Sequence, residues 1–293
     1  MDAPSKTEPE LQALIDRLHA GGRIRVWSLV ITLFGDAIVP RDGEAPLALI
    51  QSLMERLSIE SGAVRTAMSR LAADHWVERE RRGRNSFFRL DERGRHAFDL
   101  ATRRIYAAGP PDWDGSWTVA IAGKAPPASD VLELKESGFL KLSDTVFLRP
   151  RRVNQDSDLN MLLSGMLVIR GESADHPEHI RALWPSAEIA ASYDELIEAW
   201  RPLARRLERS GAMRGIDAMA ARILLIHEWR RIVLRDPGLP AALLPRDWPG
   251  EKARNLTAAI YAHLREPSDA WLDAAGLPAP QEKSGYDSRF SLI

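Results

Sequence analysis

Residues 64–90, VRTAMSRLAADHWVERERRGRNSFFRL, join an amphipathic helix to an arginine-rich hairpin. The apolar residues of the first half recur at the i, i+3, i+4 and i+7 spacing of one helix face: Val64, Ala67, Met68 and Leu71. This spacing predicts that the apolar face packs inward. The opposite, polar face then points to solvent and carries Arg65, Thr66, Ser69 and Arg70.

Two short apolar runs follow the helix, around Trp76 and around Phe87. The segment between them contains Gly83, which can adopt the left-handed conformation that tight turns need. We therefore predict a β-hairpin. Alternation along its second strand predicts that one of Phe87 and Phe88 packs in the core while the other is partly exposed. This favours a structural role for both rings over base stacking.

The hairpin carries a local positive charge. From Arg79 to Arg89 there are five arginines against one acid, Glu80, which is an excess of four positive charges in eleven positions. The formal net charge of the whole chain is -1 and provides no overall attraction to phosphates. DNA binding would therefore depend on this patch. The alternative interpretation is a solvated turn of like charges.

Two more helices are predicted upstream. Apolar residues at helical spacing between Trp27 and Phe34 indicate the first, which we expect to end near Gly35 and Asp36. The second spans residues 47–57, and after a short connector Ser61 is the expected N-cap of the third. Three helices followed by a hairpin are typical of a winged helix-turn-helix.

In a winged helix-turn-helix, the third helix enters the DNA major groove and the hairpin contacts phosphates or the adjacent minor groove. The candidate DNA-binding residues are therefore Arg65, Thr66, Ser69, Arg70, Arg81, Arg82, Arg84 and Asn85. Each of them alone is equally compatible with an ordinary solvated surface. The group at these spacings is what favours DNA binding.

The fold class predicted for the whole chain is α+β multidomain. A Pro/Gly/Asp cluster at 109–115 marks a boundary, and three β-rich runs with one helical run follow it. From about residue 192 the pattern is helical throughout. The expected organisation is an acidic N-terminal extension (1–22), a winged helix-turn-helix (23–108), a ferredoxin-like central domain (109–190), an all-helical C-terminal domain (191–275) and a flexible tail (276–293).

Composition excludes several classes of protein. The 293 residues contain no cysteine, which rules out disulfides and Cys-ligated zinc. No apolar run approaches the ~20 residues needed to span a bilayer. The N-terminus is polar, and we therefore expect a cytoplasmic protein without membrane contact.

Enzyme motifs are incomplete, so we expect no catalytic site, no cofactor and no metal. His227 and Glu228 resemble the start of an HExxH zinc site, but the next required position is Arg231. The best potential metal cluster, Asp175, His176, Glu178 and His179, is more typical of the start of a surface helix, because Pro177 lies among these acids.

Six stretches resemble the PaaX family, which are bacterial repressors of phenylacetic acid degradation. They are SLVITLFGDAIVPRDG (28–43), VRTAMSRL (64–71), RRGR (81–84), PDWDGSWTVAI (111–121), TVFLRP (145–150) and IHEWRRIVLRDPGLPAALLPRDWPG (226–250). The likeness runs in order from about Ile24 to Trp271. It implies a winged-helix domain, a ferredoxin-like domain akin to small CRISPR-associated nucleases, and a helical C-terminal domain. It also implies a homodimer that phenylacetyl-CoA releases from its operator.

Arginines clustered with an aromatic residue suit an acyl-CoA, since guanidinium groups bind phosphates in bidentate fashion. The candidate effector-binding residues are Trp200, Arg201, Arg205, His227, Arg230 and Arg231. The alternative is that these arginines form surface ion pairs or interdomain contacts with neighbouring glutamates such as Glu198, Glu208 and Glu228.

The sequence therefore favours a dimeric, ligand-responsive repressor that binds double-stranded operator DNA. A second hypothesis is a protein interaction module whose winged helix and basic turn bind a protein partner. A third, a hydrolase acting on acyl-CoA or nucleic acid, lacks a recognisable catalytic constellation.

Overall fold

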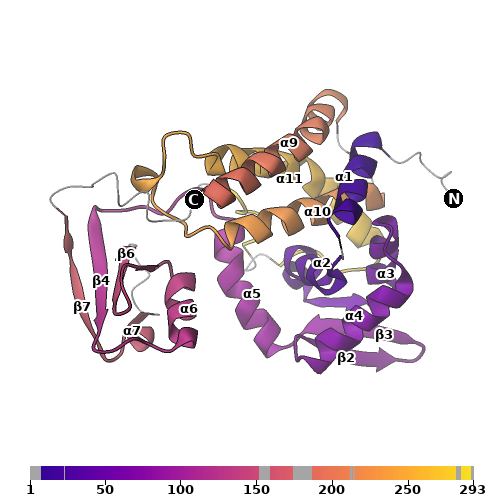
Figure 1. Ribbon diagram of the computed structural model, residues 1–293. Helices are drawn as coiled ribbons and strands as arrows, with labels where there is room; N and C mark the ends of the chain where they lie inside the picture. The colour runs from indigo at the N-terminus through magenta and orange to yellow at the C-terminus, as the bar shows by residue number, and fades with distance from the viewer. Residues whose placement is uncertain are drawn as a thin grey trace. The chain divides into compact units, whose positions relative to one another are not determined.

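The computed structural model describes residues 8–22, 24–151, 159–173, 187–211, 213, 215–281 and 285–291. The chain is α+β with a helical C-terminal region, as predicted (Figure 1). It forms two compact units: Met1–Ala108, Tyr193–Arg231 and Glu251–Ile293 make up the first, and Gly109–Ser192 with Ile232–Gly250 the second. The five-segment organisation expected from the sequence stays a prediction. No helix among the described residues is long and apolar enough to cross a membrane.

The first unit combines helices from both ends of the chain with a small antiparallel sheet. Its N-terminal helices are α1 (Pro9–Ala20), α2 (Val26–Leu33), η1 (Phe34–Ile38), η2 (Val39–Arg41), α3 (Leu47–Arg56), α4 (Ser61–Ala73) and α5 (Glu92–Ile105). The sheet has the order β1-β3-β2, formed by β1 (Glu44–Pro46), β2 (Val77–Arg82) and β3 (Asn85–Leu90). The C-terminal part of the chain supplies most of α9 (Ala187–Ser210), α10 (Gly215–Val233) and α11 (Gly250–Ala274).

Helix α1 lies in the stretch that the sequence indicated only as an acidic extension. Leu11, Leu14 and Ile15 occupy the i, i+3 and i+4 positions of one face, and all three are buried. The surrounding Glu, Asp and Arg residues conceal this short stripe in the sequence. Burial of three large apolar side chains is sufficient to fix a helix of twelve residues on the unit.

The first predicted helix does not end near Gly35 and Asp36. Helix α2 continues into the π-helical turn η1 and the 3₁₀ turn η2, so the chain stays helical up to Arg41. Gly35 is required here for packing and not as a helix terminator. A Cβ atom at this position would lie 1.4 Å from the Phe98 ring, which means that only glycine fits.

The second and third predicted helices are confirmed. In α4 the apolar stripe is buried, and the polar face is exposed. The expected N-cap is wrong, however, because Glu60 occupies that position without a side-chain cap and Ser61 is the first helical residue. Ser58 has a φ of 59° and Ile59 is buried, so the chain completes its turn one residue earlier than the sequence indicated.

The predicted hairpin is formed by β2 and β3, which pair antiparallel from Val77 opposite Leu90 to Arg82 opposite Asn85. Its two-residue turn has a positive φ of 62° at Gly83, the position where a type II′ turn requires glycine. Phe88 is buried and Phe87 is half-buried, as alternation predicted. The sheet therefore presents its basic turn at the free end of the hairpin.

The second unit contains a four-stranded antiparallel sheet of order β5-β6-β4-β7. Its elements run β4 (Ser116–Ala122), α6 (Ala128–Glu136), β5 (Leu140–Lys141), β6 (Val146–Pro150), α7 (Leu159–Leu162) and β7 (Met166–Glu172), and η3 (Ala241–Leu243) returns later in the chain. Ala120 and Phe147 pack with Leu134 of α6 on one face. Trp117 and Leu148 pack with residues 239 and 243 on the other. Both faces of the central strands thus contribute to a core.

Residues 285–291, which the sequence analysis placed in a flexible tail, are packed against other described residues. Tyr286 and Arg289 are buried, and the backbone N–H of Phe290 donates to the carbonyl of Tyr106 at 3.1 Å. This segment is part of the first unit. The sequence did not predict this packing, because the segment is polar and the residues that it contacts lie far away in the sequence.

Candidate nucleic-acid interface

The exposed face of α4 carries the four residues predicted to read DNA bases. Arg65, Thr66, Ser69 and Arg70 all point to solvent, because the apolar stripe on the opposite face is buried. The Thr66 hydroxyl donates to the carbonyl of Gly62 at 3.0 Å. Arg70 lies 3.6 Å from Asp74 in an exposed pair. Within the described part of the chain Arg65 forms no ion pair, so its full charge faces outward.

The hairpin arginines divide into two groups. Arg79 donates to the Ser86 hydroxyl at 2.8 Å, Arg89 pairs with Glu78 at 2.9 Å, and Arg82 is held by acids. By contrast, Arg81 and Arg84 at the tip form no ion pair with any residue that the structure describes. Arg81 donates only to the carbonyl of Gly83, at 3.3 Å.

Arg82 is the most tightly held arginine of the hairpin. Its guanidinium donates to both carboxylate oxygens of Glu44, at 2.6 and 2.8 Å, and to those of Glu80, at 2.9 and 2.7 Å. It also lies 4.7 Å from the centre of the Phe87 ring. The hydrogen bond from Arg82 lowers the pKa of Glu80, and the bonds to Glu80 and Glu44 raise the pKa of Arg82. Arg82 is therefore charged at any physiological pH, but two glutamates surround that charge.

The local excess of four positive charges read from the sequence needs a correction. Glu44 comes from β1, which pairs with β3 and so lies in the same sheet as the hairpin. Glu44 is 38 residues away from Arg82 in the sequence, so a count of charges within the hairpin does not include it. Asn85, the other hairpin candidate, is exposed opposite Arg82 at the end of β3. As far as the structure describes the chain, the positive charges without an ion pair on α4 and the hairpin tip are Arg65, Arg81 and Arg84.

Two of the candidate effector residues are buried among protein groups. Trp200 is completely buried, and its ring N–H donates to Glu228 at 3.0 Å; Glu228 also pairs with Arg17 at 2.7 Å. His227 is also buried, with Nδ1 lying 3.3 Å from the hydroxyl of Thr32. These contacts join α10 to α9, α1 and α2.

Arg230 belongs to the same contact region of α10. Its guanidinium donates to the Thr32 hydroxyl at 2.8 Å and to the carbonyl and hydroxyl of Ser28, at 3.0 and 2.6 Å. Burial, with help from neighbouring Arg231, lowers the pKa of Arg230 to about 10. This arginine holds α2 onto α10.

The remaining effector candidates lie nearer the surface. Arg201 pairs with Glu198 at 2.8 Å within α9, while Arg205 and Arg231 are exposed. The structure thus places the six residues in different surroundings, and their role in effector binding stays a prediction. The potential metal cluster at residues 175–179 lies outside the described residues. Among those that are described, no group of three metal-ligating side chains occurs.

His227 generates a test of this packing by pH. Burial, reinforced by Arg230 and Arg231, lowers its pKa from 6.5 to about 3. Between these values the unfolded chain binds a proton that the folded chain does not, so stability falls as the pH is lowered. We expect His227 to contribute a slope approaching about 1.4 kcal/mol per pH unit. His227→Gln should remove that slope from urea unfolding measured at pH 7, 6, 5 and 4.

The exposed His96 of α5 provides the matched control. His96→Gln should leave the pH dependence of the unfolding free energy as it is in the parent protein. An equal slope in His227→Gln and in the parent would show that His227 is not buried in its neutral form.

Comparison with known proteins identifies the family. A profile described as PaaX-like protein matches residues 25–94, and one described as PaaX-like protein C-terminal domain matches residues 184–274. The transcriptional repressor PaaX of Escherichia coli (strain K12) is 30% identical over 306 residues, covering 98% of this chain and 95% of that protein. The uncharacterized protein Rv0674 from Mycobacterium tuberculosis has a TM-score of 0.50 at 20% identity, covering 77% and 90% of the two chains, and shares the fold. The chain belongs to the PaaX-like family.

Proposed function

We propose that the protein is a transcriptional repressor of phenylacetate catabolism that binds operator DNA through α4 and the β2–β3 hairpin. The observation that supports this function most directly is a surface that combines the exposed face of α4 with two arginines of the hairpin tip that form no ion pair, Arg81 and Arg84. Such cations gain affinity by releasing counterions from phosphates. The Escherichia coli relative, a named transcriptional repressor, supports this function.

The arrangement of the first unit supports a winged helix-turn-helix. Helices α2, α3 and α4 precede the hairpin in the order that this motif requires, and α4 carries an exposed polar face. In the second unit the succession β-α-β-β-α-β with sheet order β5-β6-β4-β7 supports a ferredoxin-like domain. We assign sequence reading to α4 and phosphate contacts to the hairpin.

The repressor acts in our proposal as a cytoplasmic homodimer. One short helix buries too little surface for tight operator binding, and two copies of α4 can occupy successive major grooves of an inverted repeat. The effector is an aryl-acyl-CoA such as phenylacetyl-CoA, as the family resemblance implies. By binding one conformation preferentially, it shifts the dimer toward a state whose two α4 helices no longer match the operator.

The competing proposal is a winged-helix module that binds a protein partner. Exposed arginines can bind the acidic side chains of a protein partner as well as the phosphates of DNA. A regulator without catalysis agrees with the name of the relative.

The direct experiment is footprinting of the promoter regions of phenylacetate catabolic genes, with and without phenylacetyl-CoA. We expect protection of an inverted repeat at moderate salt and its loss at saturating effector. Absence of any protected site would contradict operator binding. Protection that persists with phenylacetyl-CoA would contradict only the choice of effector.

The salt dependence of binding tests the two free arginines of the hairpin. Each arginine that neutralises a phosphate contributes about 1 to the slope of log affinity against log salt concentration. We expect the double substitution Arg81→Ala and Arg84→Ala to reduce the slope by about 2 per chain. Fluorescence anisotropy with labelled operator at 50 to 200 mM salt measures it.

Arg209 provides the control, because it is exposed in the last turn of α9, a helix that does not belong to the proposed DNA-binding surface. Among the described residues its guanidinium donates to the Arg205 carbonyl alone. Arg209→Ala should keep the parental slope. If the double substitution also keeps it, the hairpin does not contact phosphates, and the protein-partner proposal gains.

Gly62 offers a second test on α4. It lies in the first helical turn, where a Cβ atom would meet nothing within 4 Å, so the fold itself does not require glycine. Glycine in a helix costs up to about 1 kcal/mol relative to alanine. A close approach of the DNA backbone would account for it. Gly62→Ala should therefore raise thermal stability yet weaken operator binding by about tenfold, or roughly 1.4 kcal/mol.

Gly123, exposed and equally open in the loop after β4, is the matched control. Gly123→Ala should leave operator affinity unchanged. Operator binding by Gly62→Ala at the parental affinity would mean that the DNA backbone does not approach this turn.

A further inference from the structure

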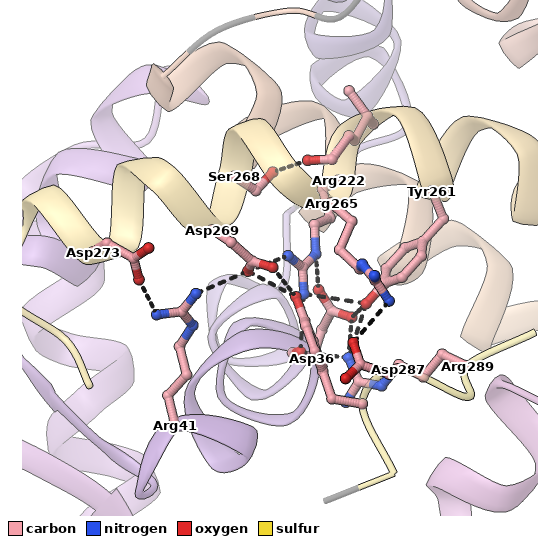
Figure 2. Close-up of polar contacts among 12 residues, drawn as sticks. Asp36, Arg41, Arg222, Tyr261, Arg265, Ser268, Asp269, Asp273, Asp287 and Arg289 are labelled. Atoms are coloured by element: carbon pink, nitrogen blue, oxygen red, sulfur yellow. Dashed lines mark hydrogen bonds and ion pairs between the residues drawn. The ribbon is translucent and has the colours of Figure 1, made fainter. Parts of the chain in front are cut away.

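The most extensively bonded carboxylate in the described structure is that of Asp36, in the η1 turn (Figure 2). One oxygen accepts from Arg222 of α10 at 2.6 Å. The other accepts from the hydroxyls of Tyr106 and Tyr261, at 2.6 and 3.0 Å, and from Arg289 at 3.0 Å. The Asp36 carbonyl accepts from both arginines as well. Five segments that are distant in the sequence meet at one buried residue.

The charges of this cluster balance. Besides Asp36, two further carboxylates belong to it. Asp269 accepts from Arg222 at 3.2 Å and forms an ion pair with Arg41 at 3.1 Å, and Asp273 pairs with Arg41 at 2.6 Å. Burial disfavours the ionised form of Asp36, but Arg222 and Arg289 outweigh burial and hold its pKa below the ordinary value. Asp36 is therefore an anion at neutral pH and needs its cations.

The C-terminal segment 285–291 supplies one of these cations. The Arg289 guanidinium lies 4.1 Å from the centre of the Tyr106 ring and 4.7 Å from that of Tyr286, in addition to its bonds with Asp36. The Tyr286 hydroxyl donates to Asp269 at 2.7 Å. The Phe290 ring packs edge-on against Tyr106, with centroids 5.3 Å apart. The receiving site thus combines aromatic rings with a buried carboxylate, a chemistry that selects a guanidinium.

The segment has no regular structure of its own to keep it in place. It contains no helix or strand, and Phe290 has a φ of 62°, which is unfavourable for an aromatic residue. The strain persists only while the site holds the Arg289 guanidinium and the Phe290 ring. Such a segment can detach locally without unfolding the helices that receive it.

We propose that residues 285–291 are a latch that docks Arg289 in the Asp36 site and thereby fixes η1, and with it α2, on α10 and α11. In the structure the latch is docked. In the released state Asp36 keeps Arg222 but loses its bonds to Arg289, and the contact between Phe290 and the end of α5 is lost. Helices α2 and α5 then hold their positions less tightly.

The consequence for DNA binding rests on the proposed function. Helix α2 precedes α3 and α4 in the chain. If η1 is no longer fixed, the position of α4 therefore varies as well. Two half-sites on one operator require a fixed placement of both α4 helices, whereas a single half-site does not. Release of the latch should therefore weaken binding to the full operator and leave half-site binding unchanged.

The experiment compares full-length Arg289→Ala, Arg289→Lys and the parent protein by hydrogen exchange without DNA. We expect amides of residues 285–291 and of 28–41 to exchange at least about tenfold faster in Arg289→Ala, with an intermediate rate in Arg289→Lys. Amides of the α10 core at 218–226 should stay protected, since Arg222 still pairs with Asp36. If Arg289→Ala fails to fold, Arg289→Lys supplies the same comparison.

Asp287→Asn is the control within the same segment, because the Asp287 side chain is exposed and its one ion pair among the described residues is with Arg265, at 3.3 Å. It should exchange like the parent. Parental protection of 285–291 in Arg289→Ala, or faster exchange of that segment alone with 28–41 unchanged, would overturn the latch.

Operator anisotropy on the same variants then separates the two proposals. A parent protein that binds no operator contradicts the proposed function and leaves the exchange result standing. A released latch with parental affinity for the full operator overturns the coupling to α4. Loss of full-site binding by at least about tenfold, with half-site binding retained, supports it.

Discussion

The ion pair between Asp36 and Arg222 is the constraint on which the first unit depends. Both side chains are completely excluded from solvent, and their atoms lie 2.6 Å apart. Removing two charges from water costs several kcal/mol each, which their mutual attraction offsets only with good geometry and further hydrogen bonds. Loss of either partner would leave the other buried charge with one remaining ion-pair partner, Arg289 for Asp36 and Asp269 for Arg222. Asp36 and Arg222 are separated by 186 residues, so the N-terminal and C-terminal parts of the chain must fold together before either charge is satisfied.

Helix α10 serves as the common support of this arrangement. Besides Arg222, it provides Trp229, whose ring N–H donates to the Ile105 carbonyl at the end of α5 at 2.7 Å, and Arg230, which bonds Ser28 and Thr32 of α2. These polar groups are all internal, and an internal polar group without a partner costs about 1–3 kcal/mol. Helices α2 and α5, which flank α3, α4 and the hairpin in sequence, are thus held in place by donors from the C-terminal part of the chain.

Local patterns were sufficient for α3, α4 and the hairpin, but they missed α1 and the continuation of α2 into η1, and they failed where partners are distant. The stripe through Val64 and Leu71 predicted α4, and Gly83 predicted the hairpin turn, because both signals lie within a few residues. Asp36 follows Gly35, a pair that favours a turn, yet it is the centre of the buried cluster. The docking of Arg289 could not be read from its polar neighbours, because Asp36 and Tyr106 lie far away in the sequence.

The arginines show why charge is the least readable signal in this chain. Arg222 and Arg289 neutralise the buried Asp36, and the buried Arg41 pairs with Asp269 and Asp273. Arg82 faces two glutamates, whereas Arg65, Arg81 and Arg84 retain their charge at the surface. The sequence does not distinguish these arginines, because the acid that neutralises an arginine often comes from another helix or strand. A formal net charge of -1 is therefore compatible with binding a polyanion. Acids that pair with arginines inside the protein count toward the net charge. Because their charge is neutralised there, they do not repel a polyanion at the surface. What decides binding is the set of cations left uncompensated on one surface, and only the folded chain shows which arginines those are.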